Sequence, residues 1–233
     1  TTSPGSKLNA YGSGSNLSVF KVDGGNGTLF EVTDQLSGSL FSVNDITGLP
    51  VMEVFSNYNV IIDKITVGRG NKNVSNTSPL TNTVVGYQAL NTNTTGVHNS
   101  AFGFRSLYSN TNGYYNSAFG GYALRNNTTG TLNSAFGYGS LRYNISGNSN
   151  SAFGSYALKS NTIGSGNSAF GRTTMRNNTS GVYNSAFGYS ALKYNTTGGS
   201  NTAVGVDALY NNTIGTFNTA AGRGSMGNNT SGA

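Results

Sequence analysis

The feature that most constrains this chain is a 17-residue repeat that fills residues 82–233 with no insertion or deletion between copies. Counted from the first residue of each copy, four positions never vary: Asn at position 1, Gly at position 5, Asn at position 12 and Gly at position 15. Self-similarity at a fixed period indicates a repeat architecture in which each unit packs only on its neighbours. The nine copies begin at Asn82, Asn99, Asn116, Asn133, Asn150, Asn167, Asn184, Asn201 and Asn218.

The unit is too short for paired helices, which need about 33 residues or more per repeat. Its Gly, Asn, Ser and Thr content also opposes helix. We interpret Ser-Ala-Phe-Gly as one strand, the stretch around Ala-Leu as a second strand, and Asn-Thr-Thr-Gly as a turn whose Asn and Gly tolerate positive φ. Each unit then forms one coil of an elongated, all-β parallel β-solenoid or β-roll, with like side chains stacked about 4.8 Å apart.

Stacking of like residues predicts both the core and an internal asparagine ladder. Ala, Phe and Leu at positions 3, 4 and 9 are expected to form a narrow core, and Asn at position 12 is expected to hydrogen-bond between coils. The core prediction comprises Phe102, Phe119, Phe136, Phe153, Phe170 and Phe187 with Leu107, Leu124, Leu141 and Leu158. Six of the position-12 residues also lie in Asn-x-Ser/Thr triplets, which would accept N-linked glycans in a host that permits it: Asn93, Asn127, Asn144, Asn178, Asn195 and Asn229. We take the structural ladder as the default for them.

Residues 1–62 have a different repeat length and form the first predicted domain. Apolar–polar–apolar triplets recur there every 10 or 11 residues, beginning at Phe20, Phe30, Phe41 and Met52. Turn-rich pieces separate them, so each triplet is a strand signal. We expect a β-rich stem resembling a β-prism or triple β-helix over 1–62, a junction over 63–81, and the solenoid over 82–233.

Composition argues against enzymatic chemistry. Charged residues make up 9% of the chain, there is no Cys, and His98 is the only histidine. A catalytic site needs convergent acids, bases or nucleophiles, and a zinc site needs a cluster of Cys, His or carboxylate ligands. No stretch approaches the 18 or so apolar residues of a membrane span. We therefore expect no enzyme activity, no cofactor, no metal and no membrane insertion.

One stripe of side chains is a candidate binding site. Position 10 is basic in five successive copies, and tyrosines lie at or beside that position in neighbouring copies. The default interpretation is a solvated stripe that keeps sheet edges and fibres apart. Exposed Arg and aromatic groups are also favoured anchors, so the functional alternative is a site for acidic glycans. The net charge of +6 over 233 residues is modest for nucleic-acid binding, which we do not expect. The candidate residues are Arg125, Arg142, Lys159, Arg176 and Lys193 with Tyr143 and Tyr194.

Thr at position 13 permits a further function. It occupies eight of the nine copies, with Ile145 as the exception. A flat threonine ladder can order water, as in ice-binding solenoids. Turn chemistry and hydrogen bonding between coils explain the same residue, since Gly follows two positions later.

The Asn-Ser-Ala-Phe-Gly units resemble the repeats in the heads of trimeric autotransporter adhesins. Gly27–Val32 and Leu40–Asp45 resemble stretches of tail-fibre proteins from marine phages. These resemblances imply a β-roll assembled as an intertwined or side-by-side homotrimer, in a virion tail fibre that attaches to a host surface polysaccharide. A thin coil that encloses little core also favours self-association in closed symmetry. The alternatives are a cell-surface adhesin or glycosylated extracellular filament subunit, and third an ice-binding solenoid.

Overall fold

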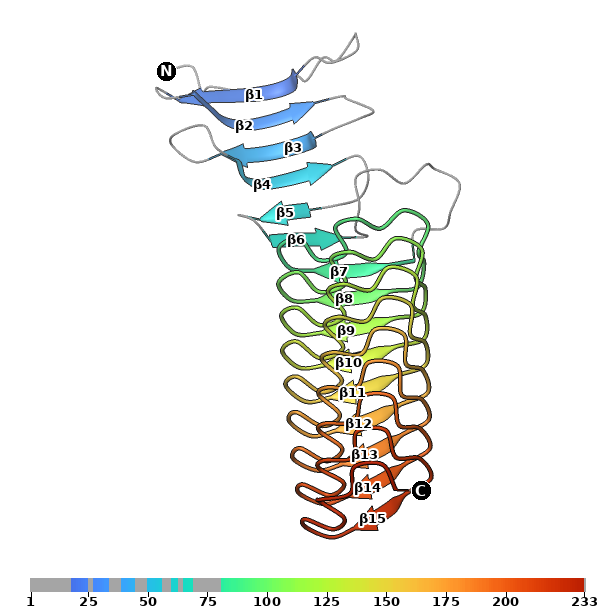
Figure 1. The fold of residues 1–233 in the computed structure, drawn as a ribbon. Helices are drawn as coiled ribbons and strands as arrows, with labels where there is room; N and C mark the ends of the chain where they lie inside the picture. The colour runs from blue at the N-terminus through green and yellow to red at the C-terminus, as the bar shows by residue number, and fades with distance from the viewer. Residues whose placement is uncertain are drawn as a thin grey trace, which may run out of the picture. The chain divides into compact units, whose positions relative to one another are not determined.

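The structure is a computed structural model that describes residues 18–24, 27–33, 39–44, 50–55, 60–62, 65–68 and 81–232. The chain divides into two compact units, Thr1–Val67 and Gly68–Ala233. Every regular element among the described residues is a β-strand (Figure 1), which confirms the all-β prediction.

The first unit is an antiparallel meander in which each strand pairs with the next one along the chain. Its first four strands contain the four triplets predicted from the sequence, because alternating apolar residues suit a half-buried strand. The β-prism or triple β-helix form of this unit stays a prediction, and most of the predicted junction, residues 69–80, lies outside the described residues. The strands are β1 (Ser18–Gly24), β2 (Gly27–Thr33), β3 (Ser39–Asn44), β4 (Pro50–Phe55), β5 (Val60–Ile62) and β6 (Ile65–Gly68).

The second unit is the parallel β-solenoid that the repeat predicts. Each coil contributes one three-residue strand, and each strand pairs with its equivalent in the next coil, as Ala118 does with Ala135. One turn of backbone per 17-residue unit is thereby confirmed. The strands are β7 (Thr83–Val85), β8 (Ser100–Phe102), β9 (Ser117–Phe119), β10 (Ser134–Phe136), β11 (Ser151–Phe153), β12 (Ser168–Phe170), β13 (Ser185–Phe187), β14 (Thr202–Val204) and β15 (Thr219–Ala221).

The predicted second strand around Ala-Leu is wrong, because this stretch is a turn. The residue at position 9, Leu or Met, adopts a left-handed backbone in every coil, as with φ of 48° at Leu141. Positions 7 and 17 share positive φ, whereas the Asn and Gly expected to carry it in the Asn-Thr-Thr-Gly turn do not. Such backbone strains an L-residue, yet Leu141 N–H still donates to the Ala157 carbonyl of the next coil at 3.0 Å. Ladder hydrogen bonds and burial of the Leu side chain hold this conformation in place.

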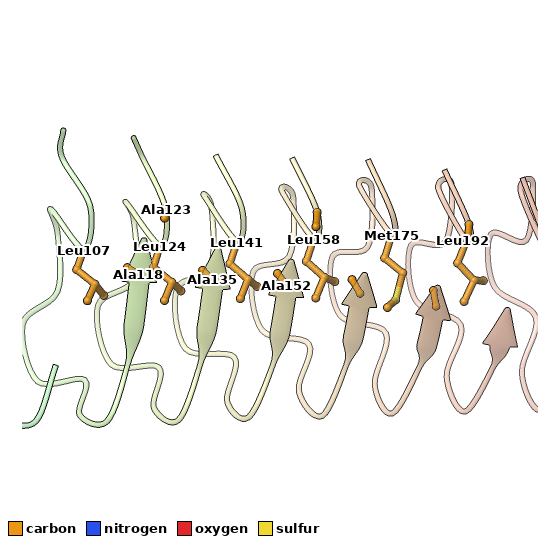
Figure 2. Close-up of a cluster of buried hydrophobic side chains, with 14 of the residues drawn as sticks. Leu107, Ala118, Ala123, Leu124, Ala135, Leu141, Ala152, Leu158, Met175 and Leu192 are labelled. Atoms are coloured by element: carbon orange, nitrogen blue, oxygen red, sulfur yellow. The ribbon is translucent and has the colours of Figure 1, made fainter. Parts of the chain in front are cut away.

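The core consists of Ala at position 3, Leu or Met at position 9, and a small residue at position 8. Figure 2 shows the Leu row, continued by Met175, running from coil to coil beside the strand alanines. The four predicted core leucines are all fully buried, as expected. The six phenylalanines are not part of this core, and that prediction is wrong. Neighbouring residues of a strand point to opposite faces, so Phe at position 4 points outward when Ala at position 3 points inward.

The outward phenylalanines stack into one continuous stripe, here called the phenylalanine stripe. Consecutive rings lie nearly parallel, with centroids 4.6 to 5.0 Å apart. This spacing confirms that like residues lie over like at the strand separation. Four rings are half-buried, while Phe170 and Phe187 are 36% and 42% exposed. The stripe comprises Phe102, Phe119, Phe136, Phe153, Phe170 and Phe187.

Two asparagine ladders run inside the coils. At position 12, Asn144 Nδ2 donates to Asn127 Oδ1 of the preceding coil at 2.8 Å and to the Gly147 carbonyl at 2.9 Å. At position 1, Asn133 donates through both its backbone N–H and its Nδ2 to Asn116 Oδ1. Buried amides that are fully hydrogen-bonded in this way fix the register between coils. The structural ladder predicted at position 12 is therefore confirmed.

The alternative role of position 12 in N-glycosylation does not fit the folded chain. Asn93, Asn127, Asn144, Asn178 and Asn195 are at most 1% exposed, and their Nδ2 atoms donate inside the coil. Asn229 is partly exposed, but its Nδ2 donates to Asn212 Oδ1 at 2.8 Å. An N-linked glycan is attached to this nitrogen, and here the nitrogen points into the ladder.

The invariant glycines allow the coils to approach one another. At position 5, Gly120 has φ of +130°, and a Cβ on it would lie 2.8 Å from the Gly137 carbonyl carbon of the next coil. At position 15, a Cβ on Gly147 would overlap the Gly164 carbonyl and Asn144 Oδ1. A side chain at Gly120 or Gly147 would therefore push two coils apart.

Candidate functional site

The basic residues predicted from position 10 lie among tyrosine rings. Arg125 is 5.6 Å from the Tyr108 ring centroid and 5.8 Å from that of Tyr122. Arg142 lies 4.8 Å from the Tyr122 centroid and 5.3 Å from that of Tyr143. These distances, measured from the guanidinium carbon, are within the range of cation–π attraction.

Cations and tyrosine rings continue to alternate in the next two coils. Lys159 Nζ lies 5.7 Å from the Tyr143 centroid and 5.3 Å from that of Tyr156, and Arg176 lies 6.0 Å from the Tyr156 centroid. Successive cations therefore share a ring, so that no cation of the series is held by its own coil alone. We call this series the cation–tyrosine row; it comprises Tyr108, Arg125, Tyr122, Arg142, Tyr143, Lys159, Tyr156 and Arg176.

The solenoid turns explain why these side chains meet. Tyr122 and Tyr156 stand at position 7, where the backbone is left-handed with φ of 60° at both residues. Only two residues separate position 7 from position 10 along the turn, and the next cation lies one coil further on. Sequence reasoning missed Tyr122 and Tyr156 as members of the site. The signal was present, because Tyr-Ala-Leu precedes the basic residue at both Arg125 and Lys159.

The cations of the row keep most of their hydrogen-bond donors free. Among residues 81–232, no protein acceptor bonds the terminal nitrogens of Arg142, Lys159 or Arg176, and Arg125 Nη1 reaches only Asn126 Oδ1 at 3.4 Å. The buried Nε atoms of Arg125 and Arg142 also have no partner there. Asp207 is the single acid of the repeats. The row is thus a line of positive charge with unpaired donors, held by ring faces.

Lys193, the fifth predicted cation, does not join the row. Its Nζ donates to the Tyr210 hydroxyl at 3.1 Å and lies 5.2 Å from the ring centroids of Tyr194 and Tyr210. The hydrogen bond from Lys193, with a second from Tyr194, lowers the pKa of Tyr210 below its ordinary value. The same contact raises the pKa of Lys193.

A shallow hollow of about 460 Å³ adjoins this pair, bordered by Tyr189, Lys193, Asp207 and Tyr210. Position 7 holds the smaller residues Ser190, Asp207 and Gly224 in these coils, whereas Tyr122 and Tyr156 occupy it in two of the earlier coils. The predicted five-residue basic ladder is therefore divided into a row of four cations and a separate lysine beside a hollow.

The remaining candidate positions have local structural roles. At position 13, the Thr111 hydroxyl donates to the Thr128 carbonyl of the next coil at 3.0 Å, and six further copies repeat this bond. Coil-to-coil hydrogen bonding, expected as one explanation of this threonine, is confirmed. His98 stacks on Tyr115 with a centroid distance of 4.8 Å.

Comparison of the chain with protein-family models, curated proteins and solved structures finds no match. No group of three or more His, Cys, Asp or Glu residues that could hold a metal ion occurs in the part of the chain that the structure describes. In that same part, no helix has the length and apolarity to cross a membrane.

Proposed function

We propose that this protein is a structural fibre that attaches to a host-cell surface, in the manner of a tail-fibre shaft or receptor-binding region, and that it binds surface polysaccharide. The observation that carries this proposal is the cation–tyrosine row. The solenoid displays positive charge along four consecutive coils, and within residues 81–232 the terminal donors of these cations have no protein acceptor other than Asn126 Oδ1, which Arg125 reaches at 3.4 Å. Anionic groups are the natural complement of such a surface.

The repeat architecture supports a mechanical role. Each coil is bonded to the next through strand pairs and two asparagine ladders, and the six coils of the phenylalanine stripe also stack their rings. Such a solenoid is stabilised by interfaces between neighbours and can extend without changing its core.

We also propose that the fibre is a homotrimer joined through the phenylalanine stripe. The stripe is a continuous apolar surface, flanked in each strand by the Ser or Thr of position 2. Contiguous exposed apolar surface of this kind marks an association site. Three copies placed around an axis would cover their stripes with one another, and the cation–tyrosine rows would be repeated around the fibre.

Binding on an array of acidic and neutral glycans tests the attachment function. The whole chain should retain acidic glycans, and retention should weaken as salt is raised because exposed charges are screened. The double variant Arg142→Gln/Lys159→Gln should lose most of this binding, whereas the control Arg223→Gln, outside the row, should keep it. Equal retention of neutral glycans, or no retention of acidic ones, would refute this function.

Sedimentation equilibrium tests the oligomer. The chain should sediment with three times its own mass, and Phe136→Ser should shift it toward monomer. Leu132→Ser, which removes a 55% exposed apolar side chain outside the stripe, is the matched control and should remain trimeric. A monomeric wild-type chain, or equal effects of the two substitutions, would refute assembly through the stripe.

A further inference from the structure

We infer that the cation–tyrosine row recognises a linear polyuronate, a polysaccharide with a carboxylate on every sugar residue, lying along the solenoid axis. This inference rests on the proposed attachment function and specifies its ligand. It commits to three properties that can be measured: the ligand is anionic, it lies parallel to the stack of coils, and its charges repeat at the coil spacing.

The spacing of the coils sets the spacing at which the backbone presents the charged residues. Arg125, Arg142, Lys159 and Arg176 occupy the same position in consecutive coils, and the stacked phenylalanine rings of these four coils have centroids 4.7 to 4.8 Å apart. In a polysaccharide whose pyranose rings are linked through ring carbons on opposite sides of the ring, each sugar lengthens the chain by a similar distance. A polymer with one carboxylate per sugar can therefore present one charge to each coil, whereas a polymer with a charge on every second sugar reaches only alternate coils.

The tyrosines fix this spacing rather than offering faces for sugar stacking. Tyr122 has Arg125 and Arg142 over its ring at 5.8 and 4.8 Å. Its edge contacts are also taken, because Phe104 and Tyr138 make edge-to-face contacts with it at 5.2 and 5.6 Å. Long basic side chains on a surface ordinarily lose rotamer freedom on binding. Cations held between rings have already lost part of that freedom, so the row is preorganised for regularly spaced anions.

The free donors select carboxylate over hydroxyl. A guanidinium presents a planar fork that bonds both oxygens of a carboxylate, and such charged pairs are about twice as strong as neutral hydrogen bonds. With no protein acceptor on the terminal nitrogens of Arg142 and Arg176 among the described coils, these forks are available. The row itself contains no carboxylate that could repel the ligand.

The test compares two oligosaccharides that carry equal numbers of carboxylates: a galacturonate tetrasaccharide, charged on every sugar, and a hyaluronan octasaccharide, charged on every second sugar. Titration calorimetry on the whole chain at one salt concentration should show roughly tenfold tighter binding of the galacturonate, because hyaluronan forfeits about two exposed ionic contacts. The preference should fall when the row is broken by Arg142→Gln. It should persist in Arg223→Gln, which loses the same charge elsewhere.

A second pair of variants tests the role of the rings as positioning residues. Tyr122→Leu leaves every charge in place but releases Arg125 and Arg142, so the preference for galacturonate should shrink while some binding of both ligands remains. Tyr115→Leu, remote from the row, should leave the preference unchanged. Equal affinity for the two oligosaccharides in the wild-type chain would overturn the inference and leave attachment to acidic glycans standing. Binding of neither would overturn both.

Discussion

Asn144 tests whether the internal amide ladder holds the coils together. Its Nδ2 donates to Asn127 Oδ1 and to the Gly147 carbonyl, and its Oδ1 accepts from Asn161 Nδ2 at 2.8 Å. Asn144→Ala removes all three bonds. Gly147 and Asn161 keep other partners, but Asn127 Oδ1 loses the only side-chain bond that reaches it from a later coil. At about 1 kcal/mol per bond, we expect a loss of about 3 kcal/mol in the free energy of unfolding.

Equilibrium unfolding in urea, followed by circular dichroism, measures this loss. The matched control is Asn177→Ala, because the Asn177 side chain is partly exposed and makes no hydrogen bond within residues 81–232. That change should cost less than about 0.5 kcal/mol. Hydrogen exchange adds a local measurement: protection should fall first at the Leu141 and Asn144 amides beside the break. Equal costs for the two substitutions, or a cost below about 1 kcal/mol for Asn144→Ala, would refute the view that the ladder carries substantial stability.

Further substitutions probe the backbone, the core and the paired lysine. Gly137→Ala should destabilise the fold by more than about 2 kcal/mol in a thermal or urea melt, since φ is +124° and the new Cβ would lie 2.8 Å from backbone of the next coil. Gly121→Ala, whose Cβ meets only a ring at 3.4 Å, should be nearly neutral, and equal effects would contradict the close-approach argument. Leu158→Ala should cost about 2–5 kcal/mol because the side chain is fully buried; a cost under about 1 kcal/mol would mean that the core is not where the structure places it. Because Lys193 stabilises the Tyr210 phenolate, one tyrosine should ionise early as pH rises in ultraviolet titration, and Lys193→Gln should raise that pKa; an unchanged curve would show that the contact does not form in solution.

The sequence was sufficient to predict the repeat period, the formation of one coil per repeat and the burial of the leucines. An uninterrupted spacing of 17 residues leaves few ways to superimpose Asn on Asn, and Leu124 and Leu141 stack as that spacing requires. It was also sufficient for the amide ladder at position 12. In each case the inference depended only on equivalence between copies, which the period determines.

What the sequence did not supply was the direction in which each side chain points. Hydrophobicity predicts a core position for Phe119, but Ala118 occupies the interior and alternation places Phe119 outside. The residue pattern predicts a strand at Leu141, but its backbone is left-handed, a conformation that single-residue propensity disfavours. The burial of Leu141 and its ladder bond to the next coil override that propensity.

For the same reason, the sequence predicts the cations of the candidate site but not their contacts with the tyrosine rings. A basic residue at the same position in five copies identified the cations without three-dimensional information. The alternation with Tyr122 and Tyr156 was not visible, because it joins a ring in one turn to a cation in the following turn. Lys193 is separate from the row because the coil of Arg176 carries Thr173 at position 7 and Asn177 at position 11, so it supplies no tyrosine ring for the two cations to share.

The equal junctions between coils have a consequence for how such a chain can change in evolution. Deletion of a whole unit, for example residues 133–149, would place the coil that begins at Asn150 directly on the coil that begins at Asn116, and these two coils already match. Duplication of the unit would likewise add one matching coil. The solenoid would become shorter or longer by one coil, with regular stacking throughout. Loss of a single residue would instead leave one coil of 16 residues, whose side chains could not all lie over their equivalents in the neighbouring coils. The length of such a solenoid can therefore change by whole coils. The residues at positions 7, 10 and 11 vary between copies, and they determine which side chains each coil presents.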